Sequence, residues 1–396
     1  MKNLWIPVHR WRGVRNDGGF LCNEFTIQEF LMIFRYGILI ATAIAILMYG
    51  VLKPLRNWDM VAYVATAYHK DGYRGADLAR ETYGDIRKTV SSARFAVLTT
   101  GEYRETVFKD PVSLEQQIPF YSIRVAYIEL IRLLKKTGLS YTRSTFVISA
   151  CFAALSVLAL GLLILKTSVP IGMLPVVAAV TGYTDLARLS TPDAMACFFS
   201  LLGIYSLMAK GRMVFPVAAI LPLIRTDLIL LSGFLMGYYI LGGKRLLASL
   251  FLLAAVGFYI LVTKQNDGYG YPTLFNFAFM GPPAPYPADI VISTQLGDYL
   301  APYWILFNNL IFHSHSVIYV VALYLFWLKR GQMENQAEFH GLFAIPFIFT
   351  TAHLLLFPSD HYRFFTFSAS LILLWILSSL ARSRQINSPH GGKAFY

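Results

Sequence analysis

The sequence predicts an all-α polytopic membrane protein with about ten transmembrane helices and amphipathic interfacial helices in a long first outer loop. Three observations lead to this fold class. The 396 residues are 56% hydrophobic and only 14% charged, whereas soluble domains carry roughly 25% charged residues. Apolar runs of about membrane-spanning length recur along the chain. Lysine and arginine fall largely in the short loops between these runs, as the positive-inside rule describes.

The net charge and the cysteines fit the same class. A formal net charge of +12 suggests nucleic acid in a soluble protein, but membrane topology explains the distribution here, so we expect no nucleic-acid partner. Cys22, Cys151 and Cys197 have no metal-ligand spacing and predict no disulfide framework. No Asn-x-Ser/Thr sequence occurs, which fits a multi-pass protein of a bacterial inner membrane.

The chain begins with a tail, one span and a long outer loop. The basic residues of the tail, residues 1–31, place it in the cytoplasm. Residues 32–52 form the first span, and residues 53–143 form the outer loop. The many positive charges of this loop do not contradict an outer location, because long loops cross the membrane regardless of their charge. Within this loop, residues 122–137 carry apolar side chains at three- and four-residue steps and charges on the opposite face. This pattern predicts an amphipathic helix along the outer interface of the membrane.

Nine further spans follow, and both termini are then cytoplasmic. They are predicted at residues 144–165, 169–183, 194–209, 214–224, 228–241, 246–262, 302–328, 341–357 and 366–381. The segment 302–328 reads as an interfacial helix followed by a span, with a break around "FHSHS". The transmembrane domain therefore covers residues 32–381, and residues 382–396 form a cytoplasmic tail that we expect to be disordered. This topology places a set of acids at the outer side: Asp59, Asp185, Asp193, Asp227 and Asp360.

The stretch "RNWDMVAY" follows the first span and places Asp59 at the membrane boundary. One explanation is structural: Asn57 or Asp59 caps a short interfacial helix, while Trp58 and Tyr63 belong to an aromatic belt. The other is a general base, because a carboxylate at this boundary can take the proton of an acceptor hydroxyl as that hydroxyl attacks. The shared outer face of the acids and arginines favours the second explanation.

A second acid comes from "GYTDLARLSTPDAMACFF". Ser190 or Thr191 can cap a helix that has Asp193 in its first turn, which is ordinary helix-start chemistry. In the functional alternative, Asp193 faces the same aqueous cavity as Asp59. Asp185, earlier in the same stretch, competes with Asp193 for this role.

Charged groups also mark two later outer ends of spans. "PLIRTDLILL" places Arg225 and Asp227 between two short apolar segments, where charges usually face a cavity or a partner. An ion pair that fixes packing explains them equally well. "PSDHYRFF" brings together Asp360, His361 and Arg363, and arginine offers fork geometry for a phosphate. Snorkelling at the interface is the alternative for this group.

Several familiar sites are absent from the sequence. There is no Walker loop, no Rossmann glycine pattern, no His-Glu-x-x-His and no Gly-x-Ser-x-Gly. His313 and His315 are two residues apart and point to different faces of a helix, so we expect no zinc site there.

The order of these motifs resembles the GT-C superfamily of polyprenyl-phosphate-sugar-dependent integral membrane glycosyltransferases. The resemblance consists of a first span, an aspartate just beyond it, a long outer loop, "TPDAMACFF" and then "PLIRTDLILL". "LIRTD" is similar to the Arg-Pro-Asp turn of many members, with Thr226 in place of the proline. "SDHYRFF" is similar to the His-Lys-Glu-x-Arg-Phe signature of the lipid-linked mannosyltransferases, but one residue rather than three separates His361 from Arg363.

The resemblance implies an enzyme that moves a sugar, with inversion, from a polyprenyl-phosphate carrier to a glycan, lipid or protein acceptor on the periplasmic face. In this family the first outer loop carries the acid held to be catalytic, which corresponds to Asp59. The second acid binds the acceptor, holds a divalent ion or assists the base; some members need a metal and others do not, so the metal stays open. The resemblance implies that the second acid is Asp193 or Asp185. It implies that the phosphate is bound by Arg363, Arg225 and His361, and that the site is supported by Asp227, Asp360 and Tyr63.

Two other functions remain open at this stage. A polysaccharide polymerase or ligase of another fold also needs arginines and a histidine at an outer face. A transporter or non-catalytic membrane component can line a permeation path with such charges. Transporters often consist of two related halves, and no internal repeat is visible here. The amphipathic helix after the first span favours the glycosyltransferase.

Overall fold

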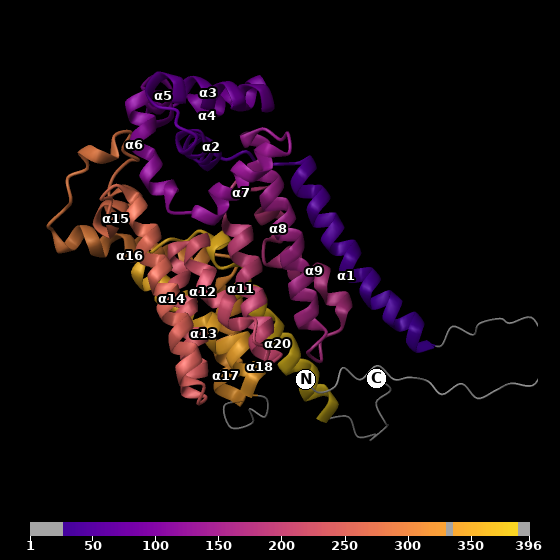
Figure 1. The fold of residues 1–396 in the computed structure, drawn as a ribbon. Coiled ribbons are helices and arrows are strands. Elements are labelled where there is room, and N and C mark those ends of the chain that lie inside the picture. The colour runs from indigo at the N-terminus through magenta and orange to yellow at the C-terminus, as the bar shows by residue number, and fades with distance from the viewer. Residues whose placement is uncertain (1–26, 330–335, 387–396) are drawn as a thin grey trace, which may run out of the picture.

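The computed structural model describes residues 27–329 and 336–386, and every regular element within these ranges is a helix (Figure 1). The predicted cytoplasmic tails lie mostly outside them. The first helix, α1 (Ile27–Leu52), includes the end of the predicted N-terminal tail, because its apolar periodicity continues upstream of residue 32. The all-helical fold class is therefore confirmed for the described part of the chain.

The long loop after α1 folds into six helices, which we call the cap. They are α2 (Asp59–Lys70), α3 (Gly75–Thr89), α4 (Ser92–Thr99), α5 (Glu102–Lys109), α6 (Pro111–Ser122) and α7 (Val125–Lys136). Figure 1 shows α2–α6 gathered at one end of the molecule. The predicted amphipathic helix is α7, and Tyr127, Ile128 and Ile131 on its apolar face are buried. This face packs against α8 (Tyr141–Ile164) and α2, which seats the cap on the bundle.

The bundle contains the remaining helices. Its first half comprises α8, α9 (Leu174–Val180), α10 (Tyr183–Arg188), α11 (Asp193–Met208), α12 (Val214–Ile224), α13 (Ile229–Leu241) and α14 (Arg245–Thr263). The second half comprises α15 (Tyr271–Phe279), α16 (Leu296–Phe312), α17 (Ser316–Lys329), α18 (Gln336–Phe339), α19 (Ile345–Leu356) and α20 (Thr366–Ile386). Single turns join some of them: η1 (Ile171–Met173), η2 (Thr226–Leu228), η3 (Lys264–Asn266), η4 (Pro287–Asp289), the π turn η5 (His340–Ala344) and η6 (Tyr362–Phe364).

The described helices are compatible with a multi-pass membrane protein. Five of them are long and apolar enough to cross a membrane, or six when the bent pair α16–α17 counts as one span. The two helices of this pair meet at 83°, so the break predicted around "FHSHS" is confirmed. The other predicted spans correspond to shorter apolar helices of 10–17 residues, whereas a span needs about 20. The count of ten spans therefore stays a prediction.

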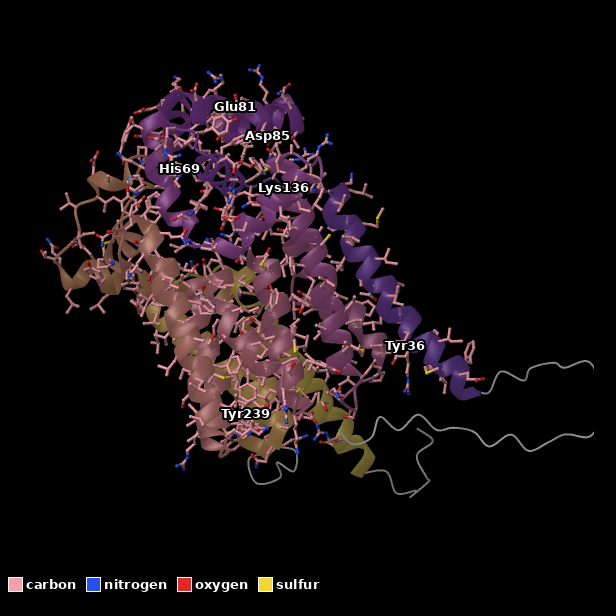
Figure 2. All side chains as sticks on the ribbon, viewed as in Figure 1. Tyr36, His69, Glu81, Asp85, Lys136 and Tyr239 are labelled. Carbon is pink, nitrogen blue, oxygen red and sulfur yellow. The ribbon has the colours of Figure 1, made fainter. Side chains whose placement is uncertain are left out.

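The surface of the bundle has the polarity of a lipid-facing surface. Leu241, Leu253 and Phe312 are exposed by 90%, 67% and 88%, and they represent many exposed apolar side chains on α1, α13, α14 and α16. Water-soluble monomers rarely expose such large apolar areas. Charged side chains gather instead at the ends of the molecule, and Figure 2 labels Glu81 and Asp85 among those of the cap.

Close packing and backbone hydrogen bonds join α1 to α10 and fix the entry to the cap. A Cβ atom on Gly50 of α1 would lie 2.6 Å from the carbonyl oxygen of Ala187, so only glycine allows this approach. The Leu55 N–H then donates to the Arg188 carbonyl over 2.8 Å, and Arg188 Nε donates to the Lys53 carbonyl over 2.8 Å. The chain after α1 is thereby held beside the segment that leads into α11.

Candidate functional site

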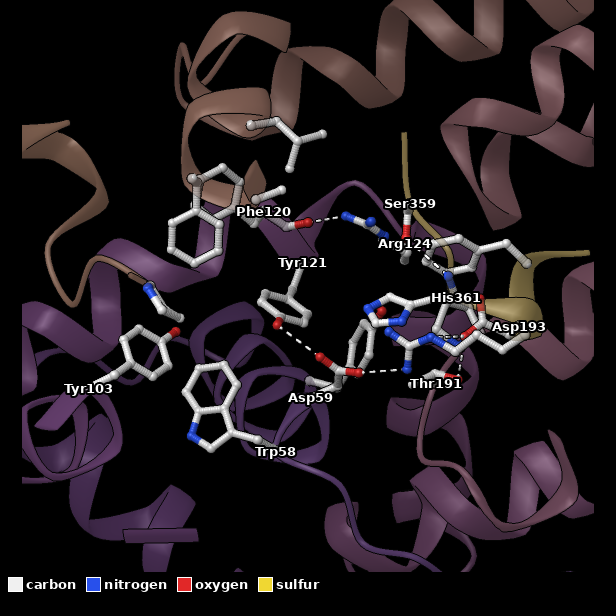
Figure 3. Close-up of a pocket in the computed structure, with 18 of the residues that line it drawn as sticks. Trp58, Asp59, Tyr103, Phe120, Tyr121, Arg124, Thr191, Asp193, Ser359 and His361 are labelled. Atoms are coloured by element: carbon white, nitrogen blue, oxygen red, sulfur yellow. Dashed lines mark hydrogen bonds and ion pairs between the residues drawn. The ribbon is translucent and has the colours of Figure 1, made fainter. Parts of the chain in front are cut away.

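A cavity of about 860 Å³ lies where the cap meets the bundle (Figure 3). Its walls come from segments far apart in the sequence, namely the starts of α2, α5 and α11, the end of α6, α15 and the segment 357–364. It collects six predicted site residues: Asp59, Tyr63, Asp193, Arg225, His361 and Arg363.

Asp59 is the first residue of α2, but its side chain does not cap the helix. Trp58 occupies the N-cap position and makes no side-chain cap hydrogen bond. The Asp59 carboxylate instead accepts from Asn57 Nδ2 over 2.8 Å and from the Tyr121 hydroxyl over 3.1 Å. The Asn57 side-chain oxygen accepts from the Ser190 N–H over 3.0 Å, which ties α2 to the start of α11. The capping explanation for Asp59 is therefore wrong.

Arg363 bridges the two carboxylates that the sequence pairs across the cavity. Its Nη1 atom lies 3.0 Å from Asp59 Oδ2, and its Nε atom lies 3.4 Å from Asp193 Oδ2. Burial opposes the charge of Arg363, but the carboxylates of Asp193 and Asp59 outweigh burial and raise the pKa of the guanidinium above its ordinary value. Arg363 is therefore a permanent cation in direct contact with both acids.

Behind Arg363 lies a second, more deeply buried arginine. The Arg225 side chain is 9% exposed and lies between Asp193 and Asp227. It contacts Asp193 through Nη1 and holds Asp227 in a two-pronged contact, with Nε to Oδ1 and Nη2 to Oδ2 both at 3.0 Å. His353 Nε2 of α19 lies 3.3 Å from Asp227 Oδ2. The packing ion pair, one of the two alternatives for "RTD", is present.

The helix α11 begins at Asp193 and has no side-chain cap. Pro192 is the N-cap residue and makes no side-chain cap bond, so the predicted capping by Ser190 or Thr191 is wrong. The Thr191 hydroxyl donates to Asp193 Oδ2 over 2.8 Å. The Asp193 side chain, only 4% exposed, thus shares its two oxygens among Thr191, Arg225 and Arg363.

His361 and Arg124 complete the polar wall. Desolvation by the surrounding protein and the neighbouring Arg363 cation lower the pKa of His361, so its imidazole is neutral at pH 7 and offers a hydrogen bond rather than a charge. Arg124 precedes α7, and its Nη1 donates to the Phe120 carbonyl. Among the described residues no carboxylate forms an ion pair with Arg124. The sequence pattern placed Arg124 on the charged outer face of α7; its position before the first helical turn directs it into the cavity instead.

Two predicted acids lie away from this cavity. Asp185 accepts from the Tyr362 hydroxyl over 3.0 Å and lies 3.7 Å from Arg188 Nη1. Asp360 accepts from Asn309 Nδ2 over 2.9 Å. Neither lines the cavity that contains Asp59. Of the two competing second acids, Asp193 is the one that the fold brings next to Asp59.

Asp185 nevertheless supports the turn that carries Arg363. Tyr362, the residue before Arg363, packs its ring over Gly182, where a Cβ would lie 3.2 Å from the ring. Gly182 has φ +86°, a backbone conformation in which a side chain is strained. The contact of Tyr362 with Asp185 therefore positions Arg363 through its neighbour.

Removing either member of this contact should displace Arg363 and lower any activity of this cavity that depends on its guanidinium. We expect Tyr362→Phe and Asp185→Asn each to lower turnover about tenfold, the equivalent of one charge-assisted hydrogen bond. The double variant should lose no more than either single variant, because one contact is involved. Turnover of the three variants measures this, and additive losses would contradict the positioning role.

A second cavity of about 540 Å³ adjoins the first and has different chemistry. Apolar side chains of α16, α17 and α19 form most of its wall. Ser359 lines both cavities, so the segment 357–364 separates a polar chamber from an apolar one. His313 and His315 lie in the break between α16 and α17, with ring centres 5.3 Å apart.

The donor set of the first cavity does not fit a divalent cation. Arg363 occupies the position between the carboxylates of Asp59 and Asp193 that a shared ion would take. Within residues 27–329 and 336–386, no three His, Cys, Asp or Glu side chains gather in a way that could hold a metal ion.

Comparisons of this chain with protein-family models, with curated proteins and with solved structures find no match.

Proposed function

We propose that this protein is an integral membrane glycosyltransferase that moves a sugar from a polyprenyl-phosphate carrier to an acceptor hydroxyl, with inversion at the anomeric carbon. The observation that carries the proposal is the contact of Asp59 with Arg363 inside the polar cavity. A carboxylate that can take a proton and cations that can stabilise a leaving phosphate are thereby placed within one ligand-sized space.

The proposed reaction assigns the proton to Asp59. The acceptor oxygen attacks the anomeric carbon from the side opposite the phosphate, and a new glycosidic C–O bond forms. The acceptor O–H bond breaks and its proton passes to the carboxylate. The bond between the anomeric carbon and the phosphate oxygen breaks, and its electron pair leaves with the polyprenyl phosphate. Asn57 and Tyr121 hold the carboxylate in place through their hydrogen bonds.

The leaving phosphate gains negative charge, and nearby cations stabilise it. Arg363 and Arg124 are the side chains we assign to this role, and His361 adds a hydrogen bond. Arg225 also lines the cavity, but its guanidinium is committed to Asp193 and Asp227. We therefore assign Arg225 to the support of the site rather than to the phosphate.

The apolar second cavity suits the carrier lipid. A polyprenyl chain needs an apolar groove that begins beside the phosphate site, and Ser359 marks the point where the two cavities adjoin. We therefore assign the lipid tail to the space between α16, α17 and α19.

Filling the second cavity should weaken the binding of long donors only. We expect Thr351→Trp, which places an indole in this cavity, to raise the KM for a long-chain polyprenyl donor about tenfold, because several buried methylene groups lose their contacts. The KM for a short citronellyl-phosphate donor should not change. The matched control is Leu253→Trp on the exposed side of α14; equal effects of the two variants, or equal effects on the two donors, would contradict the assignment.

The membrane topology forms part of the proposal. Each of the ten predicted spans has an apolar helix or a bent helix pair at its place in the chain. With both termini in the cytoplasm, the cap and the polar cavity face the periplasm of a bacterial inner membrane. The test of the function is the release of polyprenyl phosphate from a lipid-linked sugar by the purified protein, and its dependence on Asp59.

A further inference from the structure

The polar cavity has a second half that is lined by aromatic side chains of the cap. Figure 3 shows Trp58 and Tyr103 on the opposite side of Asp59 from Asp193 and His361. The charged half adjoins the apolar second cavity through Ser359. The aromatic half is walled by the cap, with residues from the junction of α4 and α5, the start of α5 and the end of α6. Asp59 therefore stands between two chemically different spaces.

The aromatic half is rigidly built. The Trp58 ring centre lies 5.0 Å from that of Tyr103 and 6.5 Å from that of Tyr121, with tilted or edge-on geometry. The Tyr103 hydroxyl donates to Gln117 Oε1 over 3.0 Å, and the Tyr121 hydroxyl donates to Asp59. Burial raises the pKa of Tyr103, so its hydroxyl stays a donor. Because the protein engages both hydroxyls, ring surfaces are what these side chains present to a ligand.

Polar residues next to Tyr103 in the sequence also line this cavity. Thr100, Glu102 and Arg104 line the same cavity from the junction of α4 and α5. Together they offer a hydroxyl, a carboxylate acceptor and guanidinium donors. A ligand that fits has a flat face of C–H groups for the electron-rich ring faces and hydroxyls around its edge. A sugar ring has this pattern, whereas a lipid alcohol needs a continuous apolar wall such as the second cavity supplies.

From this arrangement we infer that the aromatic half is an acceptor subsite and that the acceptor is a carbohydrate, one of whose hydroxyls is directed at Asp59. The role of this site as the acceptor subsite rests on the proposed function, whereas the binding of a saccharide at this site does not. In the transfer, this hydroxyl loses its proton to Asp59 and bonds to the anomeric carbon, while the donor sugar leaves its phosphate.

The test is saccharide binding without any donor. Saturation-transfer NMR on the protein in non-glycosidic detergent micelles, with short oligosaccharides of glucose, galactose, mannose and N-acetylglucosamine as probes, reports it directly. We expect at least one probe to bind the wild-type protein. Trp58→Ala and Tyr103→Ala should each weaken binding about tenfold, and Trp58→Phe should largely restore it. Trp304→Ala, on the exposed side of α16, is the matched control.

The outcomes separate this inference from the proposed function. Absence of binding for all probes, wild-type affinity in both alanine variants, an equal loss in Trp304→Ala, or displacement of the saccharide by farnesol overturns the inference. Wild-type thermal unfolding of at least one alanine variant shows that the loss is local. Donor cleavage without saccharide binding would contradict the acceptor subsite and leave the proposed glycosyltransferase function standing. Saccharide binding without donor cleavage would support the saccharide site and contradict the proposed function.

Discussion

Replacing Asp59 with asparagine should lower the rate of glycosyl transfer by a factor of about 10²–10⁴, the contribution typical of a general base. Asparagine keeps the size of the side chain, and its one oxygen can still accept from Asn57 while its amide nitrogen can donate to the Tyr121 hydroxyl oxygen, but it cannot take the acceptor's proton. Arg363 keeps its second carboxylate, Asp193. The thermal unfolding temperature of the variant should therefore stay close to that of wild type.

The control for this variant is Asp77→Asn on α3. Among the described residues, Asp77 forms an ion pair only with the exposed side chain of Arg80, and an exposed pair contributes about 0–1 kcal/mol. Its transfer rate should equal that of wild type. Losing a general base costs far more than a factor of about three in rate. If the transfer rate of Asp59→Asn is within about threefold of this control, Asp59 is not the base of the reaction.

Arg225 and Arg363 should fail in different ways when each is replaced by glutamine. Arg225→Gln leaves Asp193 and Asp227 buried with weakened compensation, and breaking a buried ion pair costs about 3–5 kcal/mol. Arg363, whose side chain is 22% exposed, has less to lose in stability. Arg363→Gln should instead lower the transfer rate by about 10²–10³, the cost of removing one donor to a developing negative charge.

Thermal unfolding and transfer rate measured on both variants separate these roles. We expect the lower unfolding temperature in Arg225→Gln and the lower rate per folded molecule in Arg363→Gln. Arg143, an exposed residue of α8 outside the cavity, supplies the matched Arg→Gln control. The reverse order, with a stable but inactive Arg225→Gln, would assign the phosphate to Arg225.

The sequence predicts the helices and a shared outer face for Asp59, Asp193 and Arg363 for a clear physical reason. In the predicted topology, alternating spans return every second loop to the same side, so we expect Asp193 and Arg363 on the same outer face as Asp59 although they are far apart in the chain. Their contact through two ion pairs agrees with that expectation. The break between α16 and α17 was also readable, because two histidines and two serines interrupt an apolar run.

Other features could not be read because they depend on how loops pack. Tyr121 and Arg124 enter the cavity at the junction of α6 and α7, where no periodicity fixes the direction of a side chain. The choice between Asp185 and Asp193 was undecided for the same reason, since both follow the same predicted span. His353 carried no motif at all, and only the packing of α19 brings it to Asp227.

The central claim is most directly tested by product release. Purified protein in lipid nanodiscs is given polyprenyl-phosphate-linked sugars and saccharide acceptors, and free polyprenyl phosphate is measured alongside the glycosylated acceptor. The account predicts that wild type releases polyprenyl phosphate in step with sugar transfer and that Asp59→Asn releases almost none while remaining folded. Release of polyprenyl phosphate by Asp59→Asn at the wild-type rate would contradict the account. It would also be contradicted if the folded wild-type protein cleaved none of the donors with any of the acceptors.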